Sequence, residues 1–351
     1  MHSMLSTLAP ATVSCTPQKI LEILAPFPHY QNTFTLIRGF ALYAVRSVNA
    51  RRLVRKMRGS AQAHLLECDD GLFYVVKFSN NPQGGRRILS NEFISSLLMK
   101  RLEIHTPEIA VVNLDHDFLK ANPEVFLSIG SNHTVTPEIG PHFGSLHVGG
   151  RVPVAVFDFL PSAMLPGVVN RGDFLGAMVF DKWASNADGR QAVFYRAQIN
   201  TEMPGYPRAG WVAQFIDNGL AFQGRDWTFY DSPVQGIYMR RIIYGRRLSL
   251  RDFDLWVSAV MQIGQDVLDG ISKLLPPAWV EGQEHELQRV LHQLHDRRGR
   301  LPELLAATVK CLLATPAQSV PLVPRRSPRV THLCSDKGTH IKNSVVARCS
   351  P

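Results

Sequence analysis

The sequence predicts an α+β fold with two lobes, a β-rich first half and a helical second half. Short apolar runs rich in β-branched and aromatic residues precede Pro161, and long helical patterns follow it. Because strands and helices are grouped and do not alternate, a βαβ sheet is not expected. The 351 residues can bury a sizeable core. The 45% apolar and 19% charged residues are typical of a folded globular chain and exclude a disordered one.

Composition divides the chain into four segments. We expect an N-terminal extension (1–44), a β-rich nucleotide-binding lobe (45–160), a helical catalytic lobe (161–315) and a flexible basic tail (316–351). The tail is rich in Pro, Ser and Thr, shows no helical or strand period, and carries more than half of the net charge of +9. The remaining charge is ordinary for a body of this size, so the charge distribution does not favour nucleic-acid binding.

Nothing in the sequence indicates a membrane protein or a secreted one. The best apolar stretches are interrupted by Arg38 or Asp158 before they reach the length of about 18 residues that a spanning helix needs. The N-terminus lacks the basic start and the apolar stretch of a secretory signal. Five widely spaced cysteines without a C-x-x-C pair fit neither a disulfide framework nor a zinc site. We therefore expect a cytoplasmic protein with reduced thiols.

A β-hairpin is predicted where the apolar runs AQAHLLEC and LFYVVKFSN flank Asp69-Asp70-Gly71. Lys77 lies in the second run and shares a strand face with Phe73 and Val75, so its ammonium group emerges from an apolar surface. Alone, such a lysine commonly snorkels to water. The run from Val45 to Gly59 before the hairpin has six basic residues and no acidic one, and a solvated face is its first interpretation.

The next elements are a helix and further strands. The four-residue spacing of apolar residues in ILSNEFISSLLMKRLEI predicts a helix from about Ser90, with Glu92 in its first turn. An acidic residue there commonly complements the helix dipole. Strands are expected in AVVNLD and in RVPVAVFDFL, which Pro161 ends. The Gly/Pro-rich stretch from Asn132 to Gly150 contains three histidines without metal-ligand spacing, and we expect a loop.

Beyond Pro161 the pattern becomes largely helical. DFLGAMVFDKWAS predicts a helix that leads into the loop 186–191. The strands AVFYRAQI and WVAQFI follow, and the second ends at Asp217-Asn218-Gly219. Carboxylates in loops at opposite ends of a strand pair can converge on one cleft. Two long helical patterns, separated by Pro276-Pro277, complete the expected lobe.

This order of residues suits phosphoryl transfer. The reaction needs a cation on the nucleotide phosphates, a carboxylate for magnesium and a carboxylate for the attacking hydroxyl. Lys77, Asp217 and Asp188 follow one another in that order. Glu92 can pair with Lys77 and hold it over the cleft. A turn of small residues precedes the hairpin, and its N–H groups can approach phosphates, although such turns are common: Gly59, Ser60, Ala61 and Gln62.

With these segments the chain resembles the HipA-like kinases, a branch of the protein-kinase-like fold that includes bacterial serine/threonine kinase toxins. The matching segments, between about Val45 and about Leu313, are GSAQAHL, YVVKF, NE, FDFLP, DKWASNADGRQAVF and FIDNGLAF. The resemblance implies a two-lobed kinase-like fold with ATP and Mg2+ as cofactors. It further implies that Asp188 is the catalytic base, that Lys77 contacts the phosphates and that Asp217 binds magnesium. The adenine site would be bordered by Asp158, Phe159 and Leu160.

The chain departs from the family pattern at Val193, where the wider family has a metal-binding asparagine five residues after the catalytic aspartate. Gln191 or Asn186 can supply the missing oxygen, since carboxamide carbonyls suit magnesium. Alternatively, the second metal position is weakened and turnover is slow. Arg190 either stabilises developing charge or forms a structural ion pair.

Four functions are compatible with these observations. The first is an ATP- and Mg-dependent kinase acting on a Ser or Thr hydroxyl of a protein, its own chain included. The second is a kinase of a small-molecule hydroxyl. The third is an ATP-binding pseudokinase or scaffold, motivated by Val193. The fourth, nucleic-acid binding, has no base-reading motif to support it. The resemblance also allows a neutralising partner protein, as in toxin–antitoxin pairs.

Overall fold

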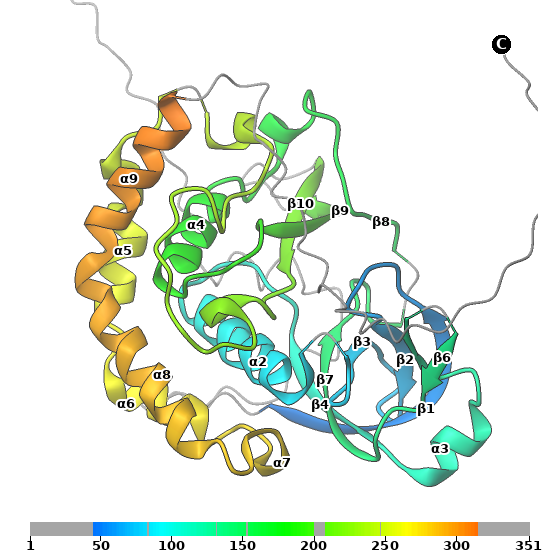
Figure 1. Cartoon of the computed structure of the whole chain (residues 1–351). Coiled ribbons are helices and arrows are strands. Elements are labelled where there is room, and N and C mark those ends of the chain that lie inside the picture. Colours follow the sequence, from blue (N-terminus) through cyan, green and yellow to red (C-terminus); the bar gives the residue numbers. More distant parts are fainter. Residues whose placement is uncertain are drawn as a thin grey trace, which may run out of the picture.

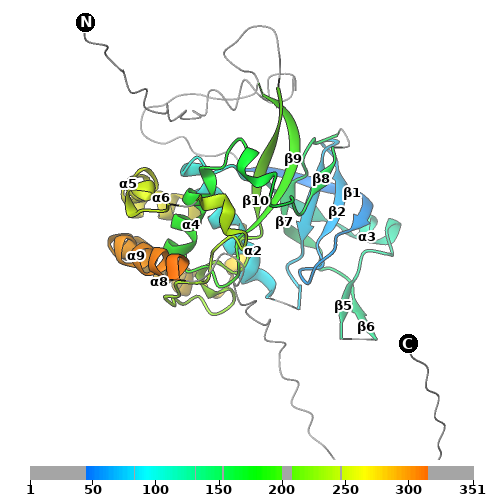
Figure 2. The same cartoon turned by 90° about the horizontal axis from the view of Figure 1, so that it is seen from above.

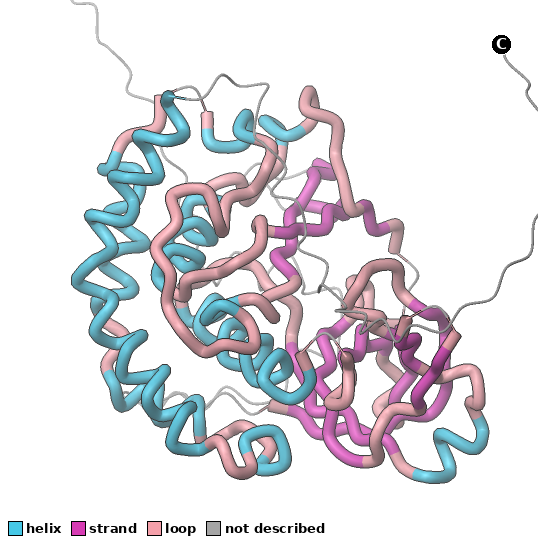
Figure 3. Tube along the Cα trace, in the orientation of Figure 1, coloured by secondary structure: helices cyan, strands magenta, loops and turns pink. Residues whose placement is uncertain are grey.

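The computed structural model describes residues 45–314 except 83, 131, 152–153, 200–207 and 246. The predicted extension (1–44) and the predicted tail (316–351) lie outside the described residues. Strands gather on one side of the molecule and helices on the other (Figure 1; coloured by type in Figure 3). The prediction of an α+β protein with a β-rich first half and a helical second half is thereby confirmed.

The first half forms a closed barrel. Its strands follow the order β1-β2-β3-β7-β4, and all neighbours are antiparallel except β1 and β4. The barrel strands are β1 (Arg46–Lys56), β2 (His64–Cys68), β3 (Phe73–Lys77), β4 (Ile109–Leu114) and β7 (Gly140–Leu146). Between β4 and β7 lie α3 (His116–Ala121), β5 (Leu127–Ile129) and β6 (His133–Val135). Alternate side chains of the strands point inward and form a separate apolar core.

Strand β1 contains most of the basic run that precedes the hairpin. Its basic side chains are exposed, and Arg52 pairs with Glu67 of β2 at 2.6 Å. The run is thus a solvated strand face, as its composition favoured.

Strand β7 replaces part of the expected histidine-containing loop. It is a central strand, paired with β3 and β4, and Gly144 lies where a Cβ would be 2.5 Å from Val112 Cγ2. His142 is buried; its Nδ1 accepts from the Ser79 N–H at 3.0 Å, and its Nε2 lies 2.8 Å from the Glu138 carbonyl. Burial lowers the pKa of His142 to about 4, which keeps the ring neutral. Strand β7 forms because it pairs with strands that are distant in the sequence, and no local pattern predicts it.

The second half contains a small sheet and most of the helices. The sheet has the order β10-β9-β8, and the β9–β10 hairpin stands out from the body in Figure 2. Its strands are β8 (Val156–Phe157), β9 (Gln191–Ile199) and β10 (Arg208–Ile216). The helices are α4 (Asp173–Trp183), α5 (Asp254–Met261), α6 (Gln265–Ser272), α7 (Pro277–Val280), α8 (Glu284–Arg297) and α9 (Leu301–Ala314). The described part of this half also contains the 3-10 turns η2 (Leu165–Gly167), η3 (Ala221–Gln223), η4 (Arg241–Tyr244), η5 (Leu250–Phe253) and η6 (Arg298–Arg300).

The two expected long helices are each broken. The first divides into α5 and α6 around Gly264, and the second divides into α8 and α9 at η6, where Gly299 and Pro302 interrupt the pattern. Glycine loses more conformational freedom in a helix than other residues, and proline lacks the N–H that a helix interior requires. Within the described residues no helix is long and apolar enough to cross a membrane.

Helix α2 (Gly85–Arg101) belongs to the core of the helical half, although its sequence lies in the predicted β-rich lobe. Its apolar side chains share one buried cluster with those of α4 and α8, and Phe93 packs edge-on against Trp279 of α7 with centroids 5.9 Å apart. The helix begins five residues before the expected start. The N–H groups of Gly84 and Gly85 both donate to the Asn81 carbonyl, and this turn leads directly into helical conformation at Arg86 and Arg87. Glu92 therefore lies two turns inside α2, facing the barrel.

Candidate active site

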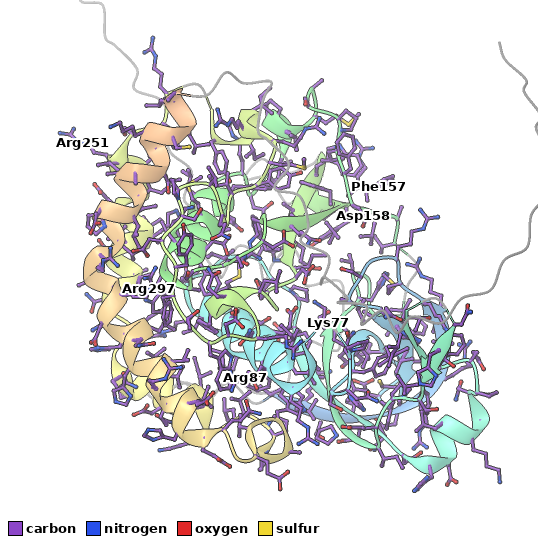
Figure 4. The ribbon with its side chains drawn as sticks, viewed as in Figure 1. Lys77, Arg87, Phe157, Asp158, Arg251 and Arg297 are labelled. Carbon is purple, nitrogen blue, oxygen red and sulfur yellow. The ribbon has the colours of Figure 1, made fainter. Side chains whose placement is uncertain are left out.

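Three charged side chains from three elements meet between the barrel and the helical half. Lys77 at the end of β3 donates from Nζ to Glu92 Oε1 on α2 and, at 2.8 Å, to Asp217 Oδ1 after β10. The exposed fractions of the side chains are 13%, 3% and 34%, respectively. Figure 4 shows Lys77 between α2 and the barrel strands. The structure thus brings together the strand lysine, the helix glutamate and the loop aspartate that the sequence singled out.

Glu92 is fixed from both sides. Its Oε2 accepts from the Asn218 N–H at 2.9 Å, so the loop after Asp217 holds the glutamate that holds Lys77. A Cβ on Gly219 would lie 3.1 Å from Glu92 Oε1 and 2.7 Å from Ile88 Cγ2, and glycine permits this close approach.

Asn91, the neighbour of Glu92, joins α2 to the segment that follows Asp217. Its Nδ2 lies 2.8 to 3.0 Å from the carbonyls of Gly219, Ala221 and Gly224. Its Oδ1 accepts from Trp227 Nε1 at 2.8 Å. The matching segment NE includes Asn91, but the sequence analysis gave it no role, because that role depends on carbonyls about 130 residues away.

The electrostatics of the cluster favour a bound cation. Burial opposes the charge of Lys77, but Asp217 and Glu92 outweigh it and raise the lysine pKa above its ordinary value. Lys77 lowers the pKa of Asp217, whereas burial raises that of Glu92. One ammonium group faces two carboxyl groups, so with both ionised the cluster has a net negative charge that a divalent cation can neutralise.

Asp217 has the features of a magnesium ligand. It adopts the left-handed conformation with φ of 62°, and its Oδ2 accepts from Gln191 Nε2 at 2.8 Å. Rotation of that amide would turn Gln191 Oε1 toward the same space, so carboxylate and carbonyl oxygens fit Mg2+. The described ranges contain no group of three or more His, Cys, Asp or Glu side chains that could hold a metal.

Asp188 lies half-buried in the loop between α4 and β9. Its Oδ1 accepts from the Gly189 N–H at 2.8 Å, and its own N–H donates to Asn186 Oδ1 at 3.2 Å. The Ala187 N–H donates to the Leu220 carbonyl at 2.9 Å. That bond ties the Asp188 loop to the segment that begins at Asp217, so the two predicted carboxylates lie on adjoining loops.

Asn186 and Arg190 take part in a second, sealed cluster around Asp181. Arg190 donates to both oxygens of Asp181, and the exposed fractions of the two side chains are 1% and 0%. Arg190 NH1 also donates to Asn218 Oδ1 at 2.7 Å. Of the two alternatives for Arg190, the geometry favours the structural ion pair. Asn186 is buried, its Nδ2 donates to Asp181 Oδ1 at 2.9 Å, and its Oδ1 accepts from the Asp188 N–H. Because both polar atoms of Asn186 already have partners, Gln191 suits the metal role better.

Val193 lies on β9 two residues after Gln191 and pairs with Gln214 of β10. Side chains two apart on a strand share a face. Methyl groups thus occupy the position at which the wider family has an oxygen ligand.

The remaining predicted site residues lie at the turn between β1 and β2 and at the link between the halves. Gln62 holds the turn through its side chain, bonded to the N–H and carbonyl of Ser128, and Gly59 has φ of 117°. The Ala61 carbonyl accepts from Asn81, and Ser60 lies in the same turn. At the link, Asp158 follows β8 and is exposed (Figure 4), whereas Leu160 is buried. The exposed Phe159 ring lies 4.3 Å from the Arg240 guanidinium.

The barrel, the helical half and the lysine–glutamate–aspartate cluster between them define a kinase-like phosphotransferase. The sequence comparison gives the family: a HipA-like kinase model matches residues 51–303, more than half of the chain. The protein therefore belongs to the HipA-like kinases, and the suspected resemblance is confirmed.

The solved structures that the comparison matches to this chain include two of the Golgi casein kinase. The one with Mn/ADP bound is 12% identical, with 76% of this chain and 73% of that chain covered and a TM-score of 0.39. The second is 10% identical, with coverages of 77% and 72% and a TM-score of 0.40. A Helicobacter pylori proinflammatory kinase, CtkA, is 12% identical, with coverages of 71% and 94% and a TM-score of 0.35. No curated protein matches the chain.

Proposed function

We propose that this kinase transfers the γ-phosphate of ATP to a serine or threonine hydroxyl of a protein, its own chain included, in a magnesium-dependent reaction in the cytoplasm. The observation that carries the proposal is the cluster of Lys77, Glu92 and Asp217 beside the Asp188 loop. Lys77 supplies the cation, Asp217 the metal ligand and Asp188 the base that phosphoryl transfer requires.

Each residue has one task in this reaction. Lys77, kept extended by Glu92, binds phosphate oxygens of ATP and neutralises their charge. The turn from Gly59 to Gln62 directs N–H groups to the phosphates, and residues 158–160 border the adenine ring. Asp217 and Gln191 would hold Mg2+, which when bound offsets the charge that develops on the phosphate oxygens.

Asp188 orients the acceptor hydroxyl and receives its proton. The hydroxyl oxygen attacks the γ-phosphorus as the bond from that phosphorus to the β,γ-bridging oxygen breaks. The electron pair of that bond leaves with ADP. No covalent enzyme intermediate is required.

Val193 motivates the second candidate, an ATP-binding pseudokinase or scaffold. The missing oxygen at this strand position leaves fewer ligands for a second ion, which would slow or abolish transfer. A small-molecule acceptor uses the same residues, and the choice of substrates in the assay separates it from a protein acceptor.

The test is transfer of labelled γ-phosphate from Mg-ATP by the purified protein, alone and with a cell extract, with ATP binding recorded in parallel. The matched variants are Asp188→Asn and Asp217→Ala. We expect label on protein serine or threonine that disappears in both variants, while Asp188→Asn still binds ATP. Tight ATP binding with no label on protein would contradict the protein-kinase proposal. Label on a small molecule alone would support a kinase that acts on a small-molecule hydroxyl.

A further inference from the structure

Lys182 on α4 is a buried cation that is directed to backbone carbonyls and not to a carboxylate. The residue is 5% exposed, and its Nζ donates to the Ser232 carbonyl at 2.8 Å and to the Gln235 carbonyl. Asp181 beside it is bound to Arg190. Burial lowers the pKa of Lys182 to about 8, although the negative charge of Asp181 acts in the opposite direction. An ammonium group without a paired carboxylate is costly to bury, so the contact with the two carbonyls needs an explanation.

The carbonyls belong to a long irregular segment. Residues 224–240, between η3 and η4, form neither helix nor strand. Irregular segments of this length inside a compact domain are uncommon and usually functional. We call residues 230–237 the anchored loop, because the helical half holds them at several points.

Two further contacts hold the anchored loop besides Lys182. Ser185 Oγ lies 2.7 Å from the Tyr230 carbonyl and accepts from the Tyr230 N–H at 2.9 Å. Asp231 pairs with Arg297 at 2.9 Å and with Arg300 at 2.7 Å. All three contacts fix the residues before Gly236.

The far end of the anchored loop is bonded to the backbone on both sides of Gly189. The Gly236 N–H donates to the Asp188 carbonyl at 2.8 Å, and the Arg190 N–H donates to the Ile237 carbonyl at 3.2 Å. Gly236 has φ of +68°, and a Cβ there would lie 2.4 Å from Asp181 Cβ. Glycine is therefore needed for this approach.

We propose that Lys182 is a positioning residue for phosphoryl transfer: it seats the anchored loop, which fixes the backbone around Asp188 and so the direction of its carboxylate. The inference rests on the proposed role of Asp188. Lys182 itself touches neither nucleotide nor acceptor. Because a misplacement of about 1 Å can lower a rate about 100-fold, loss of this contact should reduce kcat and leave ATP binding nearly unchanged.

The test compares Lys182→Met, which removes the cation at similar length, with Lys182→Arg, which keeps it. Arg171→Met is the matched control, because Arg171 also donates to a backbone carbonyl, that of Ile243, outside the anchored loop. Hydrogen–deuterium exchange reports the amides of 188–190 and 230–237, and phosphate transfer at varied Mg-ATP gives kcat and KM.

For Lys182→Met we expect faster exchange in both segments, a fall in kcat of about 10-fold or more and a change in KM for ATP below about 2-fold. Lys182→Arg should recover most of the loss, and Arg171→Met should behave as wild type. Unchanged exchange in Lys182→Met would overturn the proposal. Faster exchange with an unchanged kcat would also overturn it, since the contact would then be structural only.

A second variant keeps the proposal testable if Lys182→Met does not fold. Gly236→Ala should displace the anchored loop and lower kcat in the same way. Gly270→Ala is the control, because a Cβ there meets no atom within 4 Å. An unchanged kcat in Gly236→Ala would overturn the link between the loop and Asp188. A wild-type protein without any phosphate transfer would contradict the proposed function itself, and the exchange data would still show whether Lys182 seats the loop.

Discussion

The site contains two buried charge clusters that differ in their access to solvent and in their charge balance. In the Lys77 cluster one cation faces two carboxyl groups, and the Asp217 side chain is 34% exposed. In the Arg190 cluster one cation faces one carboxylate, both side chains are at most 1% exposed, and Asn186 and Asn218 complete the hydrogen bonds. A balanced, sealed pair has no capacity left for a ligand, whereas an unbalanced and partly open one does. The comparison separates the cluster that is proposed to bind a ligand from the cluster that supports it.

The largest expected effect is on stability, from Arg190→Leu. The substitution leaves Asp181 buried without a counter-charge, which should lower the free energy of unfolding by about 3–5 kcal/mol. Denaturant unfolding followed by circular dichroism measures the loss. The double variant Asp181→Leu/Arg190→Leu should recover part of it, because no charge then remains unpaired. A loss below about 1 kcal/mol in the single variant would mean that the cluster is not sealed.

A smaller effect, on nucleotide affinity, is expected from Glu92→Gln in the Lys77 cluster. The amide oxygen keeps the bond from the Asn218 N–H, but Lys77 loses one charged partner and moves toward Asp217. We expect nucleotide affinity to fall about 10-fold, equivalent to about 1.4 kcal/mol, by titration calorimetry. Stability should change less than in Arg190→Leu, since no charge is left unpaired: Lys77 keeps Asp217 as its partner. Glu108→Gln is the control, because Glu108 forms an exposed pair with Lys100. Equal losses in both variants would refute the specific role of Glu92.

Val193→Asn tests how many ions the open cluster can hold. It adds an oxygen on the β9 face that carries Gln191, and we expect Mn2+ to bind about 3- to 10-fold more tightly with a non-hydrolysable ATP analogue, by electron paramagnetic resonance. The buried amide should cost about 1–2 kcal/mol of stability. Val193→Thr controls for the loss of the valine. If Mn2+ affinity stays the same, no ion approaches this face.

The last expected effect concerns pH and Lys182, a buried cation without a carboxylate partner. Its folded pKa of about 8 is below the ordinary value of 10.5, so between these pH values the unfolded chain binds more protons at this site. Stability should therefore rise with pH over this range by a contribution that Lys182→Met lacks. The difference between the two unfolding curves at pH 7.5 and 9.5 isolates it. Parallel pH dependence in both proteins would show that Lys182 titrates normally.

The sequence predicts the open cluster better than the sealed one. Lys77 and Glu92 lie in strongly patterned elements, and Asp217 ends an apolar strand, so order and period locate all three. The partners of Asp181 and Lys182 lie up to 53 residues away along an irregular segment. The tripeptide Asp181-Lys182-Trp183 is identified in the sequence only through the family resemblance. Their contacts follow from how the loop folds back, which no local period encodes.

Strand β7 and helix α2 show the same limit for the fold. The Gly/Pro-rich composition around His142 favours a loop, yet pairing with β3 and β4 makes it a central barrel strand. Helix α2 was expected in the β-rich lobe, yet its apolar face packs against the helices of the second half. In both cases long-range packing outweighs local propensity.

The polar contacts of Asn91 have a consequence for movement of α2. They couple α2 to the segment after Asp217, so the helix that bears Glu92 cannot swing outward without exposing three carbonyls and an indole N–H. Outward movement of α2 would therefore break these contacts together with the Lys77–Glu92 pair, which adds to the free-energy cost of separating the lysine from the glutamate.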